Sequence, residues 1–409
     1  MATDLEEKPT LNRQLSLSLL TLYGLGVTVG AGIYVLVGAT ASKAGIHAPI
    51  AFLLAACVVA FTGFSYSELS TRFPVSAGEA EYVRRGFRSN FLSLIVGLLV
   101  VLSGIVSSAA VSIGAVGYLQ TFIPLNETTL VTIVISIIGL IAIWGIVESV
   151  TLASILTLIE LSGLALVIGY GVANKPDLLT DIPNILPEFN VEEWGGILSA
   201  GLLAFFAFVG FEDMANVAEE VKNPEKNLPR GIFLTLILST LIYFCVVTTV
   251  VLSVPMDQLV QSSAPLQLVF EGASPLLTSV FVLIAIFATL NGVLVQIIMA
   301  SRVIYGLSIQ GNLPEFLGNI NAKTRTPLNA TVLVTLIVLA LALFFPIVKL
   351  AETTSSVVLS VFCLVNLALI FVKLRAELPE TKAFIVPIWV PICGLLTSLG
   401  LLLSQFLTL

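Results

Sequence analysis

Two glycine-interrupted stretches inside apolar runs carry the backbone groups best suited to chemistry in this sequence. The first is "GLGVTVGAGIYVL" at residues 24–36, and the second is "FFAFVG" at 205–210. Glycine weakens a helix by about 1 kcal/mol relative to alanine, so a glycine cluster in mid-helix favours a break. A break frees peptide N–H groups at the start of the second half-helix, next to the positive end of its dipole. Paired half-helices of this kind predict a site for a carboxylate.

One acidic side chain, Glu160, lies near the middle of a third apolar run, "ESVTLASILTLIELSGLALVIGYG" at 148–171. An ionisable group in mid-membrane costs at least ~2.5 kcal/mol and is a functional hypothesis by default. Glu160 either binds and releases a proton, or stays ionised and holds Na⁺ or the amino group of a basic ligand. A neutral, hydrogen-bonded acid is the least costly form in an apolar bundle, which favours the proton. The structural alternative is a hydrogen bond to a neighbouring helix.

The composition places these groups in a membrane protein built of helices. The chain has 409 residues, of which 57% are hydrophobic and only 11% are charged. Soluble domains carry about a quarter charged residues. Its four cysteines form no CxxC pair and it has one histidine, so neither a disulfide nor a metal site is predicted. No basic patch suggests nucleic acid.

Eleven membrane spans are predicted from windows of about 19 residues. They run at about 15–40, 47–70, 90–118, 128–146, 149–173, 194–217, 231–254, 274–307, 327–347, 351–373 and 385–408. Pro74 and Gly78 predict a helix break in the loop after the second span.

The basic residues predict the orientation of these spans. With the N-terminus in the cytoplasm, fifteen Lys and Arg residues fall on the cytoplasmic side and only three on the other. Lys and Arg near span ends resist translocation, so this bias supports both the orientation and the span count. The C-terminus is then expected outside.

The two interrupted spans, the first and the sixth, are five helices apart. An odd offset makes the second group of five helices begin on the opposite face of the membrane, which predicts two units of inverted topology. Paired interruptions at matching positions of inverted halves point to a transporter site. Close helix packing is the alternative role of such glycines, and it suits Gly24 and Gly26 at least as well. For residues 28–32 together with 206–210, the broken helix is favoured.

Four ordered blocks resemble the amino acid–polyamine–organocation superfamily, especially its cationic amino acid transporter branch and the bacterial relatives of that branch. They are "VTVGAGIYVLVG" (27–38), "FSYSELSTRFPVSAGEAEYV" (64–83), "FFAFVGFEDMANVAEEVKNPEKNLPRGI" (205–232) and "SRVIYGLSIQGNLPEFLGNINAKTRTPLNA" (301–330). The resemblance implies an all-α integral membrane protein with the LeuT-type five-helix inverted repeat and broken helices 1 and 6. It divides the chain into a cytoplasmic tail (1–14), a ten-helix core (15–373, with repeats at about 15–173 and 194–373) and an extra helix (374–409).

The resemblance also implies a substrate site at the two breaks. The substrate carboxylate would be bound by backbone N–H groups of an unwound stretch formed by Thr28, Val29, Gly30, Ala31 and Gly32. The substrate amino group would be bound at the second break, which contains Gly210, by the backbone carbonyls of Phe206, Ala207 and Val209. Phe206 would also cover the site as an outer gate, while Phe205, Phe208 and Phe211 are expected to pack in the bundle.

The coupling residues follow from the same resemblance. Many proton-coupled relatives have Lys where this chain has Glu160, so their lysine mechanism does not transfer. Asn291, in "ATLNGVLVQ" at 288–296, is the expected neighbour of Glu160, with an interhelical hydrogen bond as its structural alternative.

These observations predict a secondary amino acid transporter that works by alternating access, with proton-coupled symport of a neutral amino acid favoured. A cationic amino acid or polyamine transporter or exchanger, or a Na⁺-coupled symporter, is the alternative. An enzyme is not predicted, since catalytic motifs such as HExxH and GxSxG are absent, and no cofactor is expected. A channel would need rings of charge or filter loops. The expected setting is the lipid bilayer of the cell membrane, as a monomer or homodimer.

Overall fold

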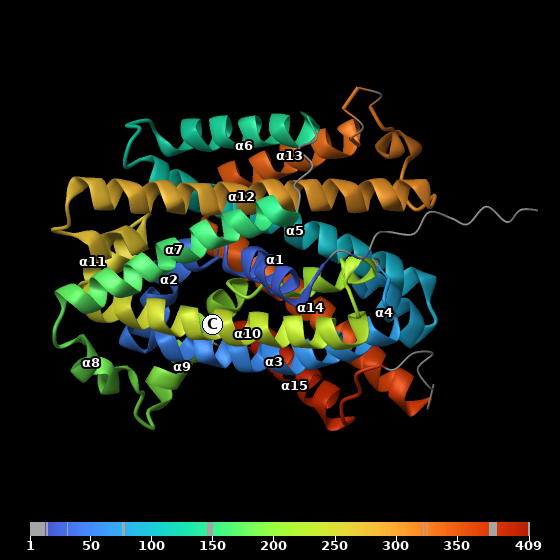
Figure 1. Ribbon diagram of the computed structural model, residues 1–409, viewed down its shortest axis with the longest axis horizontal. Coiled ribbons are helices and arrows are strands. Elements are labelled where there is room, and N and C mark those ends of the chain that lie inside the picture. The colour runs from blue at the N-terminus through green and yellow to red at the C-terminus, as the bar shows by residue number, and fades with distance from the viewer. Residues whose placement is uncertain are drawn as a thin grey trace, which may run out of the picture.

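The long helices of this computed structural model run roughly along a common axis (Figure 1). The structure describes residue 13 and residues 15–30, 32–75, 78–144, 150–321, 323–324, 326–375 and 383–407. Within these residues the extended pairing is limited to an isolated parallel bridge between Leu15 and Val221. The all-α prediction is therefore confirmed.

The helices follow one another with short connections. Those of ten or more residues are α1 (Leu17–Val29), α2 (Gly32–Ala44), α3 (Ala48–Arg72), α4 (Gly78–Phe87), α5 (Asn90–Leu119), α6 (Glu127–Trp144), α7 (Val150–Asn174), α9 (Val191–Phe206), α10 (Pro224–Ser253), α12 (Pro275–Ile309), α13 (Leu328–Phe344), α14 (Ile347–Leu374) and α15 (Trp389–Leu407). Short turns of helix lie between them: η1 (Gly45–His47), α8 (Leu178–Asp181), η2 (Ile182–Ile185), η3 (Phe211–Ala215), η4 (Ala218–Glu220), α11 (Met256–Gln261), η5 (Pro265–Phe270) and η6 (Glu315–Gly318).

These helices match the eleven predicted spans in order. Among the described residues, eight helical segments are long and apolar enough to cross a membrane, and three further apolar helices are shorter. The first predicted span corresponds to α1 and α2, which are separate helices, and the sixth to α9 followed by η3. The two interruptions predicted in spans one and six are thus confirmed.

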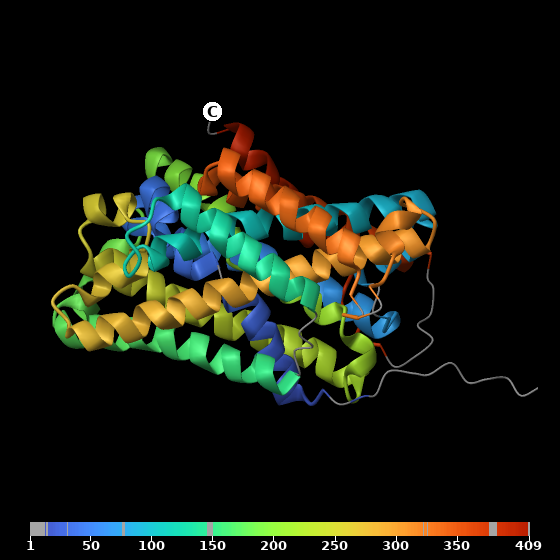
Figure 2. The same cartoon turned by 90° about the horizontal axis from the view of Figure 1, so that it is seen from above.

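The α1 helix lies inside the bundle, between α7 and α10 (Figure 1). Seen from above, α6 and α13 lie side by side at one flank of the molecule (Figure 2). Two of the longest helices start at serine caps: the Ser89 hydroxyl accepts from the Leu92 N–H at the start of α5, and the Ser274 hydroxyl accepts from the Leu277 N–H at the start of α12. The first break is held by the packing of α1 on α7 and α10.

The α4 helix lies where the sequence predicted only a loop with breaks at Pro74 and Gly78. It begins at Gly78 itself and packs against α5 and α14. The pKa of Glu81 is lowered overall. Burial alone would raise this pKa, but the hydrogen bonds from Arg84 and Arg85 lower it by more. A short helix with this much charge gives no signal in a search for membrane spans. We call the end of the bundle where α4 lies the α4 end.

The last helix, α15, packs on α3 and α14. The chain just before it is fixed by Glu68, whose side chain is fully buried. One carboxylate oxygen of Glu68 accepts from the Val386 N–H at 2.8 Å and lies 2.7 Å from the Lys373 ammonium. A buried carboxylate is stable only with such partners, because removing one would leave an uncompensated charge. This contact attaches α15 to the rest of the bundle.

Candidate functional site

The first break is shorter than the sequence predicted. Helix α1 continues through Thr28 and Val29, and α2 begins at Gly32. The expectation that Thr28 and Val29 are unwound is therefore wrong: as helical residues they use their N–H groups inside α1. Gly30 caps α1, and Ala31, also expected here, lies outside the described residues. The N–H groups left without helical partners by this geometry are those of the first turn of α2, beginning at Gly32.

The second break is a tight turn. After Phe206, the N–H groups of Ala207, Phe208 and Val209 each bond to the carbonyl three residues earlier, at 3.1, 2.9 and 3.2 Å. Gly210 follows with φ +121°, a conformation that glycine adopts readily. Its N–H donates to the Glu212 carboxylate at 2.9 Å. Of the carbonyls expected to accept from a substrate, that of Phe206 already accepts from Val209.

The two breaks touch each other. A methyl group placed on Gly32 would lie 2.6 Å from the Cα of Ala207. One placed on Gly210 would lie 2.7 Å from the carbonyl oxygen of Val27. Only residues without a side chain allow the backbones to approach this closely. The structure therefore brings together the two glycine stretches that the sequence singled out.

A tyrosine that sequence reasoning missed joins the two breaks. The Tyr243 hydroxyl, on α10, lies 2.8 Å from the Thr28 carbonyl oxygen and 2.7 Å from the Ala207 carbonyl oxygen. The side chain is fully buried. A hydroxyl has one proton to donate, so the two carbonyls share it. The available signal was a tyrosine inside an apolar span, since a buried Tyr hydroxyl usually has a partner.

Replacing Tyr243 with phenylalanine is expected to reduce transport by about threefold to tenfold, because a net hydrogen bond of roughly 0.5–1.5 kcal/mol is lost between the two breaks. Initial uptake rates in proteoliposomes measure the effect. Tyr170→Phe, on α7, is the matched control, since no hydrogen bond of the Tyr170 hydroxyl to another described side chain or backbone is seen. Equal rates in the two variants would show that the shared proton has no part in transport.

Glu160 lies beside the first break. Its side chain is 2% exposed, and a methyl group on Gly30 would lie 3.8 Å from one of its carboxylate oxygens. The Asn291 amide, on α12, donates to the other oxygen at 3.4 Å. The Tyr34 hydroxyl, on α2, donates to the Glu160 backbone carbonyl at 2.6 Å. The structure thus places the two candidate coupling residues together, next to the break that separates α1 from α2.

The aromatic residues around the second break divide as expected. Phe205 and Phe211 pack edge-on against Phe362, and Phe208 packs against Tyr243 at 5.0 Å between ring centroids. The expectation that these three phenylalanines pack in the bundle is confirmed. Phe206 is 4% exposed, and its role as an outer gate stays a prediction.

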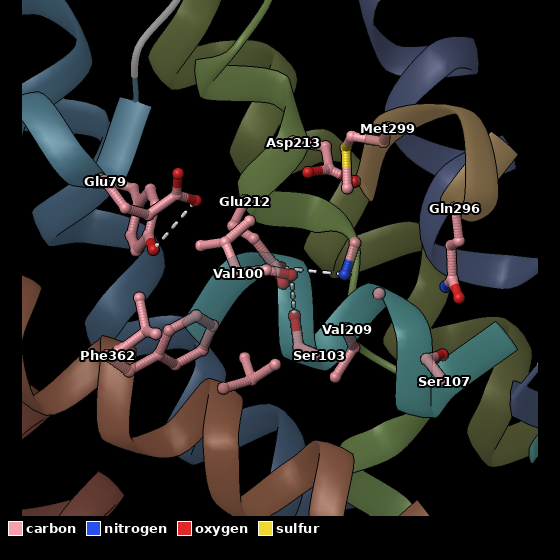
Figure 3. A pocket seen from close by; sticks show the side chains of 15 residues that line it. Glu79, Val100, Ser103, Ser107, Val209, Glu212, Asp213, Gln296, Met299 and Phe362 are labelled. Atoms are coloured by element: carbon pink, nitrogen blue, oxygen red, sulfur yellow. Dashed lines mark hydrogen bonds between the residues drawn. The ribbon is translucent and has the colours of Figure 1, made fainter. Parts of the chain in front are cut away.

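A cavity extends from the second break toward the α4 end (Figure 3). Its volume is about 30 Å³, enough for a water molecule. Its wall includes Val209 and Gly210 of the break, and the rest comes from α3, α4, η3, α5, α12 and α14: Tyr66, Glu79, Glu212, Asp213, Val100, Ser103, Gly104, Ser107, Gln296, Met299, Val358, Val361 and Phe362. A ligand released from the breaks toward the α4 end would have to widen this cavity to pass.

Comparison with known protein families gives a match over almost the whole chain. The family described as amino acid permease matches residues 15–408. The branched-chain amino acid permease BcaP of Bacillus subtilis is similar at 30% identity, over 98% of this chain and 88% of that protein. The vacuolar cationic amino acid transporter 4 of Arabidopsis thaliana is 27% identical over 89% of this chain, which spans 64% of its length. The methylthioribose transporter of Bacillus subtilis is 29% identical over 95% of this chain and 87% of that protein.

A solved structure shows the same fold. It is a Na⁺-coupled sialic acid symporter in a substrate-bound, outward-open state, with a TM-score of 0.61 and 11% identity, over 96% of this chain and 90% of that one. At 11% identity, this similarity is evidence for the fold alone. It supports the LeuT-type arrangement of helices that the sequence predicted.

Proposed function

This chain belongs to the amino acid permease family, and we propose that it is a secondary transporter that moves an amino acid through a cell membrane by alternating access, coupled to protons. The observation that carries the proposal is the contact between the two helix breaks, with Gly32 against Ala207. Peptide groups at half-helix ends suit the carboxylate and the ammonium group of an amino acid. We propose that Gly30, Ala31 and Gly32 face the carboxylate and that Phe206, Ala207, Val209 and Gly210 face the amino group.

The proton is proposed to bind at Glu160. This carboxyl is buried, accepts from Asn291 and lies beside Gly30, so a change in its charge acts directly on the first break. A neutral carboxyl avoids the large cost of an isolated buried charge, which supports a proton as the coupling ion. The proposal includes inverted repeats at about 15–173 and 194–373, the N-terminus in the cytoplasm and the C-terminus outside. The α4 end is then the cytoplasmic end.

A neutral amino acid is the proposed substrate, because apolar residues such as Val100, Val209 and Val358 line much of the cavity next to the break. A basic amino acid or polyamine is the second candidate. It is supported by the acidic side chain Glu160 at the site and by the similarity to proteins named cationic amino acid transporters. Na⁺ in place of the proton is a further alternative.

Uptake into proteoliposomes tests the proposal directly. The purified protein is offered labelled branched-chain amino acids, basic amino acids and methylthioribose, the classes named for similar proteins, each with an imposed H⁺ or Na⁺ gradient. We expect accumulation of a neutral amino acid driven by an inward proton gradient. Accumulation driven only by Na⁺ would overturn the proton coupling, and uptake of methylthioribose without any amino acid would overturn the substrate class.

A further inference from the structure

Three carboxyl groups line the cavity next to the second break. Glu79 and Asp213 are 3% and 7% exposed, and Glu212 lies beside them (Figure 3). Among the described residues that line the cavity there is no Lys, Arg or His. Full ionisation would place like charges together in a poorly solvated space, which is unfavourable.

The three acids come from two groups of helices. Glu79 belongs to α4, which packs on α5 and α14, whereas Glu212 and Asp213 belong to η3, which packs on α1 and α10. The two groups meet at Asn216: a methyl group on Gly78 would lie 2.2 Å from its side-chain oxygen, and its amide donates to Asp213 at 3.4 Å. We call this contact between α4 and η3 the seam. It joins α4 to η3 next to the cavity, which both elements line.

A polar group on the opposite wall indicates that the cavity has a polar occupant. Ser107, on α5, is 1% exposed and lines the cavity, and its hydroxyl makes no hydrogen bond to another described residue (Figure 3). A buried hydroxyl without a partner is costly, so water or a ligand is expected beside it. Among the described residues, no three acidic, His or Cys side chains are grouped to hold a metal ion. Water and protons fit this wall better than a bound metal.

Among the described residues, the groups that act on Glu79 are Asp213 and Tyr66, and neither carries a positive charge. The Tyr66 hydroxyl of α3 donates to Glu79 at 3.4 Å, and η3 presents Glu212 and Asp213. On α4 itself, the other titratable groups are Tyr82 and Glu81. Glu81 forms ion pairs with Arg84 and Arg85. On α14, Lys373 binds Glu68, and Arg375 donates to the backbone oxygens of Gly86 and Arg85. The walls from α5, α12 and α14 are uncharged.

Burial, with a further contribution from the charge of Asp213, raises the pKa of Glu79 to about 7. The closed seam therefore binds a proton more tightly than an exposed glutamate does. The closed seam is most stable at low pH, where Glu79 is protonated. Its stability falls as the pH rises through about 7, because ionised Glu79 is favourable only where water reaches it.

We propose that Glu79, Glu212 and Asp213 form a proton-binding site at the seam, which stays closed while the site is protonated and opens when the proton passes to cytoplasmic water. The inference rests on the proposed transport function and adds a second proton site to it, on the cytoplasmic side of the breaks. Ionised Glu79 and Asp213 repel each other across the seam, so the same event releases the proton and opens the path for the substrate.

Substrate counterflow at controlled pH tests this proposal. Proteoliposomes are prepared with the cytoplasmic face inward, the outer pH is fixed, and the lumen pH is set between 6 and 8. The ionised fraction of a group with a pKa near 7 rises about tenfold over this range, so the wild-type exchange rate is expected to rise several-fold with a midpoint near 7. In Glu79→Gln the rate is expected to stay at the low-pH value throughout.

Three further variants make the result decisive. Glu81→Gln replaces a second glutamate of α4, one that lies outside the cavity. This variant is expected to keep the wild-type pH profile. Glu79→Asp keeps a carboxyl and is expected to restore the pH dependence. Glu192→Gln, at an exposed acid on α9 outside the cavity, is expected to keep the wild-type profile. Wild-type counterflow at one fixed pH shows whether the chain transports at all, so failure of the proposed function is distinguished from failure of the seam.

Three results would overturn the seam proposal. The first is a wild-type profile in Glu79→Gln. The second is equal inactivation of Glu79→Gln and Glu79→Asp, since that would assign Glu79 to packing alone. The third is an effect of Glu79→Gln that depends on the charge of the substrate but not on the lumen pH. That result would indicate a cation-binding site in place of the proton site.

Discussion

Replacing Gly210 with alanine is expected to reduce transport by about tenfold or more. Gly210 has φ +121°, where an L side chain is strained by about 1–3 kcal/mol. The added methyl group would also lie 2.7 Å from the carbonyl oxygen of Val27. Because that oxygen is backbone, the clash is relieved only by moving η3 away from α1. The Gly210 N–H bond to Glu212 would be disturbed by the same movement.

Gly195→Ala is the matched control for this prediction. Gly195 lies on α9, in the same predicted span, and a methyl group there meets no atom within 4 Å. It is expected to transport like the wild type. Initial uptake rates and thermal unfolding in detergent are measured for both variants, so that loss of transport is separated from loss of the folded protein. Normal uptake by Gly210→Ala would mean that the close contact of the two breaks is not needed.

The positions of the breaks were predictable from the sequence because their causes are local. Glycine disfavours helix wherever it occurs, and a five-helix offset between two interrupted spans limits the number of arrangements. The contact between Gly32 and Ala207 and the packing of Phe208 on Tyr243 agree with that reasoning. The placement of Glu160 beside Asn291 depended on the family resemblance, since nothing in the spacing of residues 160 and 291 brings them together.

Other features depended on tertiary structure. Thr28 and Val29 were expected to be unwound, but α1 continues through Val29 and is held in helical form by packing on α7 and α10. Tyr243 gave no periodic or motif signal, because its partners are backbone carbonyls from two distant helices. Glu79 belongs to a short helix whose charges resemble those of a loop, and its burial arises from the packing of α4 on α5, α14 and η3 and from its contact with Tyr66 of α3.

The two proposed proton sites lie in different places, one beside the first break and one in the cavity next to the second break. Glu160 contacts the region of Gly30, whereas Glu79 faces the cavity at the α4 end. Each lies where a mobile contact is expected: Glu160 between α7 and α1, and Glu79 between α4 and η3. A change of charge at either position therefore acts on a contact between helix groups, which is what alternating access requires.

Replacing Glu160 with glutamine is expected to abolish pH-driven uptake while counterflow exchange continues. Glutamine keeps the size and polarity needed beside Asn291 but cannot bind or release a proton. Coupling free energies in proteins typically correspond to roughly 5–150-fold effects, so proton-driven accumulation should fall by about tenfold or more. Exchange needs the breaks but no net proton movement, and it should remain near the wild-type rate.

The control for this variant is Glu192→Gln at the start of α9, an exposed acid outside the site. It is expected to keep full pH-driven uptake. Asn291→Ala should weaken the coupling less than Glu160→Gln, because it removes a hydrogen bond and leaves the titrating group in place. If Glu160→Gln accumulated substrate as the wild type does under an inward proton gradient, Glu160 would have a structural role and the proton would have to bind elsewhere. If counterflow were lost together with uptake, Glu160 would instead be needed to hold the first break in shape.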